Sequence, residues 1–247
     1  MPIIQINFLY KTLLILILGF FLFSVNKLIY HDNIIIFDNV NTQKLSLNNN
    51  NNNNKNKISV ELFVMSRCSD AIICEAIFDK VVRQVHNISI TTTDYIAVLD
   101  DSAKYGAHCK HSNIECIGNI QELCFQHIYP NQSIYFSFLT CLNSDSSRVG
   151  TKRWAKKCIQ DECGLDYDPI DKCVNSNLGK ELFISSVQKA YRRNVTKSCT
   201  IFINGKLRCI RDGIWYNCDG GYSVDDFVYD IKDAYYNNYN NYNNHIN

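Results

Sequence analysis

The pattern of hydrophobic and polar residues predicts regular secondary structure mainly in the middle of this chain. Residues 58–65 form an apolar run rich in β-branched residues, which is typical of a buried strand. A polar turn follows, and residues 71–85 then carry apolar side chains at every fourth position, the spacing of one helix face. Ser69 or Asp70 is expected to cap this helix. Residues 90–99 read as a second strand, so the pattern predicts two parallel strands joined by a crossover helix.

The pattern also predicts strands and a helix near the other end of the chain. The expected elements are a helix over 178–192, strands over 199–203 and 206–210, and a helix over 224–235. Asn204-Gly205, between the two strands, is a typical two-residue hairpin turn. Residues 119–177 lack clear strand patterns and are expected to form short helices. A β-α-β start, a helical insertion and a β-β-α end predict an α/β fold with the thioredoxin-like order of elements.

A separate apolar run lies near the N-terminus. Residues 12–26 are strongly apolar and follow Lys11, the arrangement of a signal peptide, so we expect residues 1–27 to be a cleaved signal. With residues 3–10 added, the run reaches the roughly 20 residues of a membrane span, and a retained signal-anchor is the alternative. The chain is expected to contact a membrane only if this segment is retained.

Asparagine-rich stretches flank the predicted domain on both sides. Residues 28–57 end in an asparagine run, and residues 237–247 repeat asparagine and tyrosine. Such segments have little apolar surface to bury and are expected to be disordered. The folded domain is therefore expected to span residues 58–236.

Charge and cysteine content narrow the classes of function. The chain has 25 basic and 24 acidic residues, so charge gives no argument for a nucleic-acid partner. Twelve cysteines behind a signal peptide are expected to form mostly disulfides, because the secretory pathway is oxidising. Three sequons, at Asn87, Asn131 and Asn194, are candidate glycosylation sites and agree with secretion.

Cys68 is the leading candidate for chemistry because it follows the first strand and precedes the first helix. The helix dipole and the free N–H groups of a first turn stabilise a thiolate, the reactive form of cysteine. Redox enzymes of this fold carry a second cysteine one turn later, where this chain has Ala71. Cys74 comes next, but six residues of helix rise about 9 Å, beyond the roughly 7 Å Cα separation of a disulfide. A reactive single thiol and two inert structural half-cystines both stay open.

A second cysteine cluster extends from Cys109 to Cys124 and resembles a family signature. Its sequence, CKHSNIECIGNIQELC, is similar to the motif C-Q-H-G-x-x-E-C-x-G-N-x-x-x-x-C of the gamma-interferon-inducible lysosomal thiol reductase (GILT) family. The residues that match in register are Cys109, His111, Glu115, Cys116, Gly118, Asn119 and Cys124. Lys110 and Ser112 replace Gln and Gly. The resemblance covers roughly residues 58–236, and it implies a thiol–disulfide oxidoreductase that reduces protein disulfides in a secretory or endolysosomal compartment.

The same cluster has a metal-binding interpretation. Cys109, His111, Cys116 and Cys124 are ligand types that zinc accepts, but they lack the closely spaced pairs of structural zinc sites. Disulfide formation would also compete for the thiols. For His111 a hydrogen-bonded structural role is favoured over a role as catalytic base.

The resemblance also bears on Cys199. The thioredoxin fold and the GILT pattern place a cis-proline before the strand that faces the active cysteine, and Cys199 occupies the aligned position. Cys199 is therefore expected near Cys68, close enough to bond it or to resolve a mixed disulfide. The cysteines expected to be structural are Cys109, Cys116, Cys124, Cys141, Cys158, Cys163, Cys173, Cys209 and Cys218. Cys209 and Cys218 are expected to close a local loop.

These observations favour a thiol–disulfide oxidoreductase with Cys68 as nucleophile. Cys74, Cys199 or a small external thiol would resolve the mixed disulfide, and disulfide-bonded proteins would be the substrates. No glycine-rich phosphate loop occurs, and neither a nucleotide nor a metal cofactor is implied. One alternative is a non-catalytic secreted module, stapled by disulfides, that binds another protein. A cysteine hydrolase would need His108 or His111 beside Cys68.

Overall fold

The computed structural model describes the main chain of residues 57–244 and the side chains of residues 57–238. The predicted signal segment and nearly all of the predicted linker lie outside the described residues. Within the described part, no helix has both the length and the hydropathy that a membrane crossing requires.

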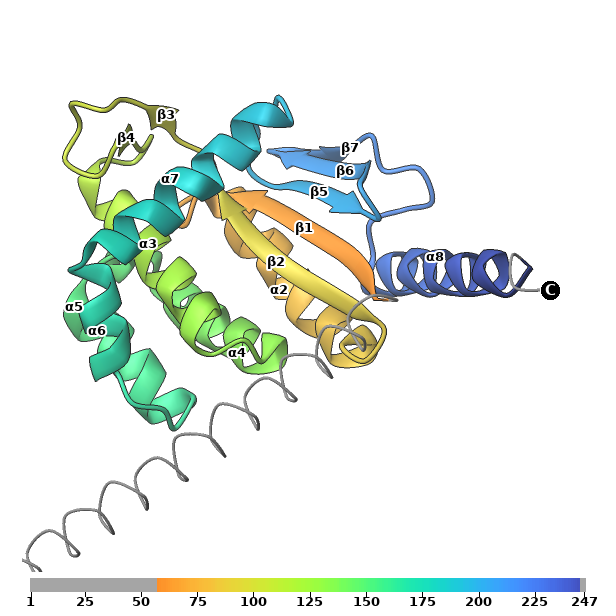
Figure 1. Cartoon of the computed structure of the whole chain (residues 1–247), viewed down its shortest axis with the longest axis horizontal. Helices are drawn as coiled ribbons and strands as arrows, with labels where there is room; N and C mark the ends of the chain where they lie inside the picture. The colour runs from red at the N-terminus through yellow and green to blue at the C-terminus, as the bar shows by residue number, and fades with distance from the viewer. Residues whose placement is uncertain (1–56, 245–247) are drawn as a thin grey trace, which may run out of the picture. The chain divides into compact units, whose positions relative to one another are not determined.

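A five-stranded mixed sheet, in the order β2-β1-β5-β6-β7, forms the centre of the domain (Figure 1). Strand β1 (Ile58–Val64) pairs in parallel with β2 (Ser89–Tyr95) and antiparallel with β5 (Thr200–Ile203). Strands β6 (Lys206–Asp212) and β7 (Ile214–Tyr216) extend the sheet antiparallel. The predicted thioredoxin-like order of elements is confirmed, with β7 as a strand that the sequence pattern did not indicate.

Helices cover both faces of this sheet and form the insertion. Helix α2 (Ser69–Val85) connects β1 to β2, and α7 (Asn177–Arg192) crosses the opposite face (Figure 1). The remaining elements are β3 (Val98–Leu99), β4 (Ala107–His108), α3 (Asn113–Ile128), α4 (Gln132–Asn143), a 3₁₀ turn (Ser146–Arg148), α5 (Lys152–Lys157), a π-helical turn (Cys158–Glu162), α6 (Asp168–Val174) and α8 (Val224–Asn244). The short helices expected between the two halves are therefore present.

Helix α2 differs from the expectation at its start and along its apolar face. Its N-cap is Cys68, so Ser69 and Asp70, the expected caps, both lie inside the first turn. The carboxylate of Asp70 accepts from Gly213 N (3.0 Å) and pairs with Arg211 (3.0 Å). Ile73, expected in the buried stripe, is 39% exposed, whereas Phe78 is fully buried. The buried face is therefore rotated from the one that the four-residue spacing indicates.

Helix α8 continues past the predicted boundary and through residues expected to be disordered. It runs to Asn244, and Asn237 Nδ2 donates to Asp233 Oδ2 (3.0 Å) one turn earlier. No glycine or proline interrupts this stretch, so nothing in the local sequence ends the helix. The expectation of a disordered tail from residue 237 is therefore corrected for residues 237–244, which are helical.

The two faces of the sheet bury separate apolar clusters. The large cluster lies between the sheet, α2, α8 and the insertion, and Phe78 meets Phe227 there with ring centroids 5.0 Å apart. The small cluster lies on the α7 face and consists of Phe63, Met65, Ile96, Ala190, Val195 and Phe202. Cys68 packs against the small cluster as well as the large one. The turn after β1 therefore lies where the two clusters meet.

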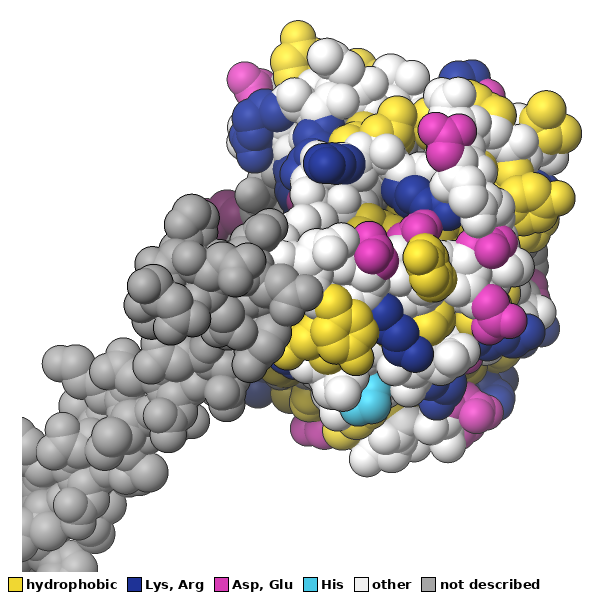
Figure 2. Space-filling view, turned by 90° about the vertical axis from the view of Figure 1, so that its right-hand side faces the viewer, with side chains coloured by type: hydrophobic (Ala, Val, Ile, Leu, Met, Phe, Trp, Pro, Cys, Tyr) yellow, Lys and Arg dark blue, Asp and Glu magenta, His cyan; other side chains and the backbone are white. Residues whose placement is uncertain are grey.

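The surface is mixed in charge on the side that faces the viewer in Figure 2. Basic and acidic side chains are interspersed there, and hydrophobic side chains form separate groups (Figure 2). This agrees with the nearly equal numbers of basic and acidic residues in the chain.

A group of weak acids is buried in the large cluster. Glu75 on α2 and Glu122 on α3 are 2% and 1% exposed. Tyr95 OH donates to Glu122, and Asn143 Nδ2 donates to Glu75 Oε2 (2.6 Å). Burial raises the pKa of Glu75 to about 7, against the opposing effect of the Asn143 hydrogen bond. Burial and the neighbouring Glu75 raise the pKa of Glu122 as well.

We expect the domain to lose stability as the pH rises from about 5 to about 7. Glu75 titrates near 4.5 as a free carboxyl and near 7 when folded, so the folded state holds an extra proton in this window. Stability is greatest below the lower pKa, and this carboxyl alone accounts for a decrease on the order of 3 kcal/mol. Urea unfolding at several pH values measures the effect. Glu75→Gln should flatten the profile, and the exposed control Glu181→Gln should not. Equal slopes in the two variants would contradict this assignment.

Candidate active site around Cys68

Cys68 occupies the start of α2 with a free, half-buried thiol. Its backbone is extended (φ −84°, ψ 133°), and its carbonyl oxygen accepts from Ile72 N (3.2 Å). The dipole of the 17-residue α2 favours negative charge at this end. The residue is thus placed at the start of a helix, where a substrate can still reach the sulfur.

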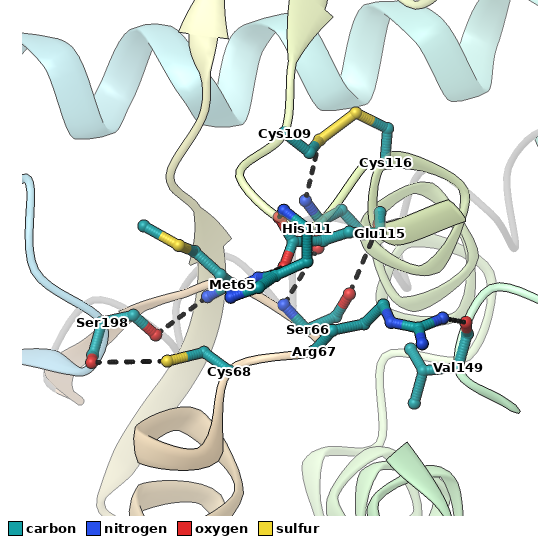
Figure 3. A network of polar contacts seen from close by, with 11 residues as sticks. Met65, Ser66, Arg67, Cys68, Cys109, His111, Glu115, Cys116, Val149 and Ser198 are labelled. Carbon is teal, nitrogen blue, oxygen red and sulfur yellow. Dashed lines mark hydrogen bonds and ion pairs between the residues drawn. A yellow bond between two sulfur atoms is a disulfide. The ribbon is translucent and has the colours of Figure 1, made fainter. Parts of the chain in front are cut away.

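The loop before β5 faces Cys68 from the other side of the turn. Met65 N donates to Ser198 Oγ (3.0 Å), and Cys68 Sγ lies 4.0 Å from Ser198 O (Figure 3). The peptide bond between Ser198 and Cys199 is cis. The loop that carries Cys199 therefore lies next to Cys68, as the resemblance to the GILT pattern led us to expect.

Cys199 does not bond Cys68, because it forms a disulfide with Cys74. The Cα atoms of this pair are 6.3 Å apart, and both residues are fully buried. The bond fastens α2 to the loop before β5. The expectation that Cys199 bonds Cys68 or resolves its mixed disulfide is set aside for this state of the protein, since neither Cys74 nor Cys199 has a free thiol.

The other free thiol among the described residues belongs to Cys163, which was expected in a disulfide. Its neighbour Cys158 is bonded to Cys141, and this leaves Cys163 unpaired. Cys163 Sγ donates to Ile134 O (3.9 Å). Burial, helped by the charge of Glu162, raises the pKa of this thiol to about 11, so it is protonated at neutral pH.

The other disulfides all link cysteines that the sequence indicates as structural. They are Cys109–Cys116, Cys124–Cys173, Cys141–Cys158 and Cys209–Cys218. Cys209–Cys218 closes a local loop at the β6–β7 hairpin, and Cys124–Cys173 joins α3 to α6. Because Cys109 and Cys116 bond each other, their sulfurs are not available as zinc ligands. Among the described residues, no group of histidine, cysteine and acidic side chains is arranged to hold a metal ion.

Residues of the 109–124 motif support the turn that carries Cys68. Asn119 Oδ1 accepts from Ser66 N (3.2 Å), and Asn119 Nδ2 donates to Cys109 Sγ (3.6 Å), so one amide joins the turn to the Cys109–Cys116 disulfide. Ser66 Oγ donates to the carbonyl of Glu115 (3.4 Å). The backbone N–H and the hydroxyl of Ser66 therefore both find their partners on the first two turns of α3.

Gly118 allows α3 to approach the turn that carries Cys68 closely. A Cβ atom on Gly118 would lie 2.8 Å from Ser66 Oγ and 2.7 Å from a methyl of Val149. Arg67 Nη1 donates to Val149 O (3.0 Å), which closes the turn from the other side. Ser66, Arg67 and Ser198 were missed by sequence reasoning. Their adjacency to Cys68 and Cys199 was the available signal.

His111 and Glu115 form a pair at the start of α3. His111 Nδ1 and its backbone N–H both contact the Glu115 carboxylate, which is fully buried. This agrees with the hydrogen-bonded role favoured for His111. His108, the other histidine considered, pairs with Asp100 (2.8 Å). Ser112, which replaces the glycine of the family motif, has φ +76°, a region that glycine adopts at least cost.

Comparisons with known proteins agree with these features. Residues 59–162 match the model of "Gamma interferon inducible lysosomal thiol reductase (GILT)". A curated Arabidopsis thaliana protein, "Gamma-interferon-responsive lysosomal thiol protein", is 26% identical over 127 residues, which cover 51% of this chain and 48% of the relative. The chain therefore spans about half the length of this curated relative.

A solved structure of low sequence identity shows the same fold, and a second one aligns less closely. The oxidoreductase NmDsbA1 of Neisseria meningitidis aligns with a TM-score of 0.51 at 9% identity, over 76% of this chain and 87% of that one. MdbA, a thiol-disulfide oxidoreductase of Corynebacterium diphtheriae, aligns with a TM-score of 0.49 at 12% identity, over 73% and 85%. The matched segment and the motif that supports Cys68 lead to one conclusion: over residues 59–162 this chain is similar to the gamma-interferon-inducible lysosomal thiol reductase family.

Proposed function

We propose that this protein is a thiol–disulfide oxidoreductase that reduces protein disulfides with the single thiol of Cys68. The observation that carries the proposal is a free, half-exposed thiol at the N-cap of α2, in a turn held by the residues that define the family motif. No second thiol adjoins it, because Ala71 stands one turn later and Cys74 is bonded to Cys199. The chain is therefore expected to work as a monothiol enzyme.

The chemistry proceeds through exchange of sulfur–sulfur bonds. The Cys68 thiolate attacks one sulfur of the substrate disulfide, so a bond from Cys68 to substrate forms and the substrate S–S bond breaks. The other substrate sulfur leaves as a thiolate and takes up a proton. A small external thiol then attacks the Cys68 sulfur and releases the second substrate thiol. A second small thiol restores Cys68, and the two small thiols leave as their own disulfide.

A secretory or endolysosomal compartment is part of the proposal. Five disulfides in one domain are typical of proteins outside the cytosol. The greater stability expected at acidic pH, which follows from Glu75, would suit an acidic lumen. Asn87, Asn131 and Asn194 are all exposed, as glycosylation requires.

Trapping the mixed disulfide tests the proposal. Without a small thiol, incubation with a disulfide peptide should give a one-to-one adduct at Cys68, identified by intact mass and by non-reducing peptide mapping. Steady-state turnover should then rise with the concentration of small thiol. In Ala71→Cys a second thiol one turn from Cys68 should resolve the adduct without added thiol.

The rival is a non-catalytic binding module, which the alanine at position 71 favours. If no adduct forms while Cys68 is shown to be reduced, the oxidoreductase proposal is wrong and the rival stands. Adducts at other cysteines would move the active site away from α2.

A further inference from the structure

A basic pocket of about 730 Å³ lies on the helical insertion. The end of the 3₁₀ turn, α5 and the π-helical turn line it, all of them within residues 148–161. The charged side chains of the lining are four basic and one acidic, namely Arg148, Arg153, Lys156, Lys157 and Asp161. Because the whole chain is almost balanced in charge, this excess is local, and a concave surface lined mostly by one sign of charge concentrates counter-ions. We call it the Trp154 pocket, after the aromatic residue in its lining.

Trp154 holds two of these cations in place. The guanidinium carbon of Arg148 lies 5.3 Å from the centre of the Trp154 ring, and Lys157 Nζ lies 5.8 Å from it. Both distances are within the range of a cation–π contact. Two of the four positive charges therefore have defined positions around one indole ring.

The segment that carries the pocket is fixed to α4. Trp154 Nε1 donates to Leu142 O (3.1 Å), and a disulfide joins Cys158 to Cys141. The indole and the π-helical turn are thus both attached to one helix. The pocket is therefore largely formed before a ligand binds, which lowers the cost of ordering its groups.

The other two cations have no partner of opposite charge. Arg153 and Lys156 are exposed, and neither forms an ion pair with any side chain of residues 57–238. The two cations at the indole, in contrast, pair with Asp145 (2.8 Å) and Asp161 (3.5 Å). Arg153 and Lys156 lie three positions apart on α5, where like charges repel each other, and a ligand with at least two negative charges would relieve this repulsion. The pocket therefore suits a polyanion better than a single anion.

The lining also distinguishes between classes of polyanion. Its residues, all within 148–161, include no strand, so a peptide would find no open sheet edge there for its backbone. Within the same range no large apolar side chain is exposed enough to enter a membrane interface. The aromatic ring already carries two cations, which limits stacking with nucleic-acid bases. Thr151 and Gln160 add neutral hydrogen-bonding groups among the cations, and these suit hydroxyl groups.

We infer that the Trp154 pocket binds a linear sulfated saccharide. Sulfate groups pair with Arg153 and Lys156, and the planar guanidinium offers two parallel donors to such an oxyanion. Sugar hydroxyls bond Thr151 and Gln160. Clusters of lysine and arginine over a few residues are a sequence signal for ligands of this class. Sulfated saccharides occur outside the cytosol, as disulfide-rich proteins do. The site does not use Cys68, so this inference does not depend on the proposed function.

Calorimetric titration of the full-length chain with a heparin tetrasaccharide tests the inference. Binding to one site is expected at about 0.15 M salt, with an affinity that falls as the salt concentration increases. In the double variant Arg153→Gln, Lys156→Gln the affinity should fall about tenfold, the scale of two surface ion pairs. This variant should reduce a disulfide peptide at the wild-type rate, because neither residue belongs to the Cys68 site.

Trp154 reports binding from inside the pocket. The chain has two tryptophans, so Trp215→Phe leaves Trp154 as the only source of tryptophan emission. The tetrasaccharide should change this emission at the concentrations that saturate the calorimetric signal. Unchanged emission during saturable binding would place the saccharide elsewhere and overturn the inference.

A matched control separates the pocket from basic surface residues in general. Arg192 and Lys206 are also exposed and lie outside the pocket, so Arg192→Gln, Lys206→Gln should keep the wild-type affinity. Equal losses in the two double variants, or equal affinity for the tetrasaccharide after removal of its sulfates, would show that the pocket does not select this ligand. Tighter binding of an acidic peptide, a phosphatidylserine vesicle or a single-stranded oligonucleotide would also contradict the inference, because each belongs to a class that the lining disfavours.

Discussion

Replacing Cys68 with serine is expected to lower the rate of thiol–disulfide exchange by on the order of 10³-fold or more, the scale seen when an enzyme loses its nucleophile. Serine keeps the size and the N-cap position, but its hydroxyl does not ionise near neutral pH and forms no disulfide. The measurement is reduction of a disulfide peptide at acidic and neutral pH in the presence of a small thiol.

Cys163→Ser is the matched control for this variant. It removes the other free thiol among the described residues, which is also half-buried and lies in the insertion. Activity close to wild type is expected, because burial keeps the Cys163 thiol protonated. Activity that survives Cys68→Ser but disappears in Cys163→Ser would place the reactive sulfur in the insertion instead.

The double variant Cys74→Ala, Cys199→Ala is expected to lose about 5 kcal/mol of the free energy of unfolding. The Cys74–Cys199 bond joins residues 125 positions apart, and closing so long a loop removes much of the entropy of the unfolded chain. Both residues are fully buried, so the lost sulfur atoms also leave a small cavity. Urea unfolding without reductant, monitored by circular dichroism, measures the difference from wild type.

Removing Cys209–Cys218 in the same way provides the comparison. That bond spans 9 positions, for which the chain-entropy relation gives about 2.5 kcal/mol. The two double variants should therefore differ by about twofold in lost stability. Equal losses would mean that loop length does not determine the contribution of the Cys74–Cys199 bond, and that local packing does.

Local patterns predicted the elements that position the site, and they did so for physical reasons. The turn at Asn204-Gly205 requires positive φ at both residues, and the structure has 50° and 77° there. The apolar run before Cys68 and the polar turn around it specify a strand and a helix start. Helix boundaries were less certain, because Asp70 finds partners on β6 and the β6–β7 turn, which local sequence does not reveal.

Disulfide pairing could not be predicted from local patterns because it depends on tertiary placement. The local sequence around Cys163 does not distinguish it from the bonded cysteines. It has no partner because α4 contacts the π-helical turn at Cys158, and Cys141 bonds that residue. The family motif did indicate Asn119 and Gly118, but their contact with Ser66 became apparent only in three dimensions.

The bond between Cys74 and Cys199 has a consequence for biosynthesis. Cys199 bonds Cys74, and the residue before it, Ser198, has its carbonyl oxygen 4.0 Å from the Cys68 sulfur, so Cys199 is the one cysteine with a candidate partner at two positions of α2. A Cys68–Cys199 linkage would strand Cys74 in the interior and deliver a folded but inert molecule. During oxidative folding, Cys199 must therefore bond Cys74 and not Cys68. The fraction of active molecules in a preparation is then expected to depend on how often the correct pair forms.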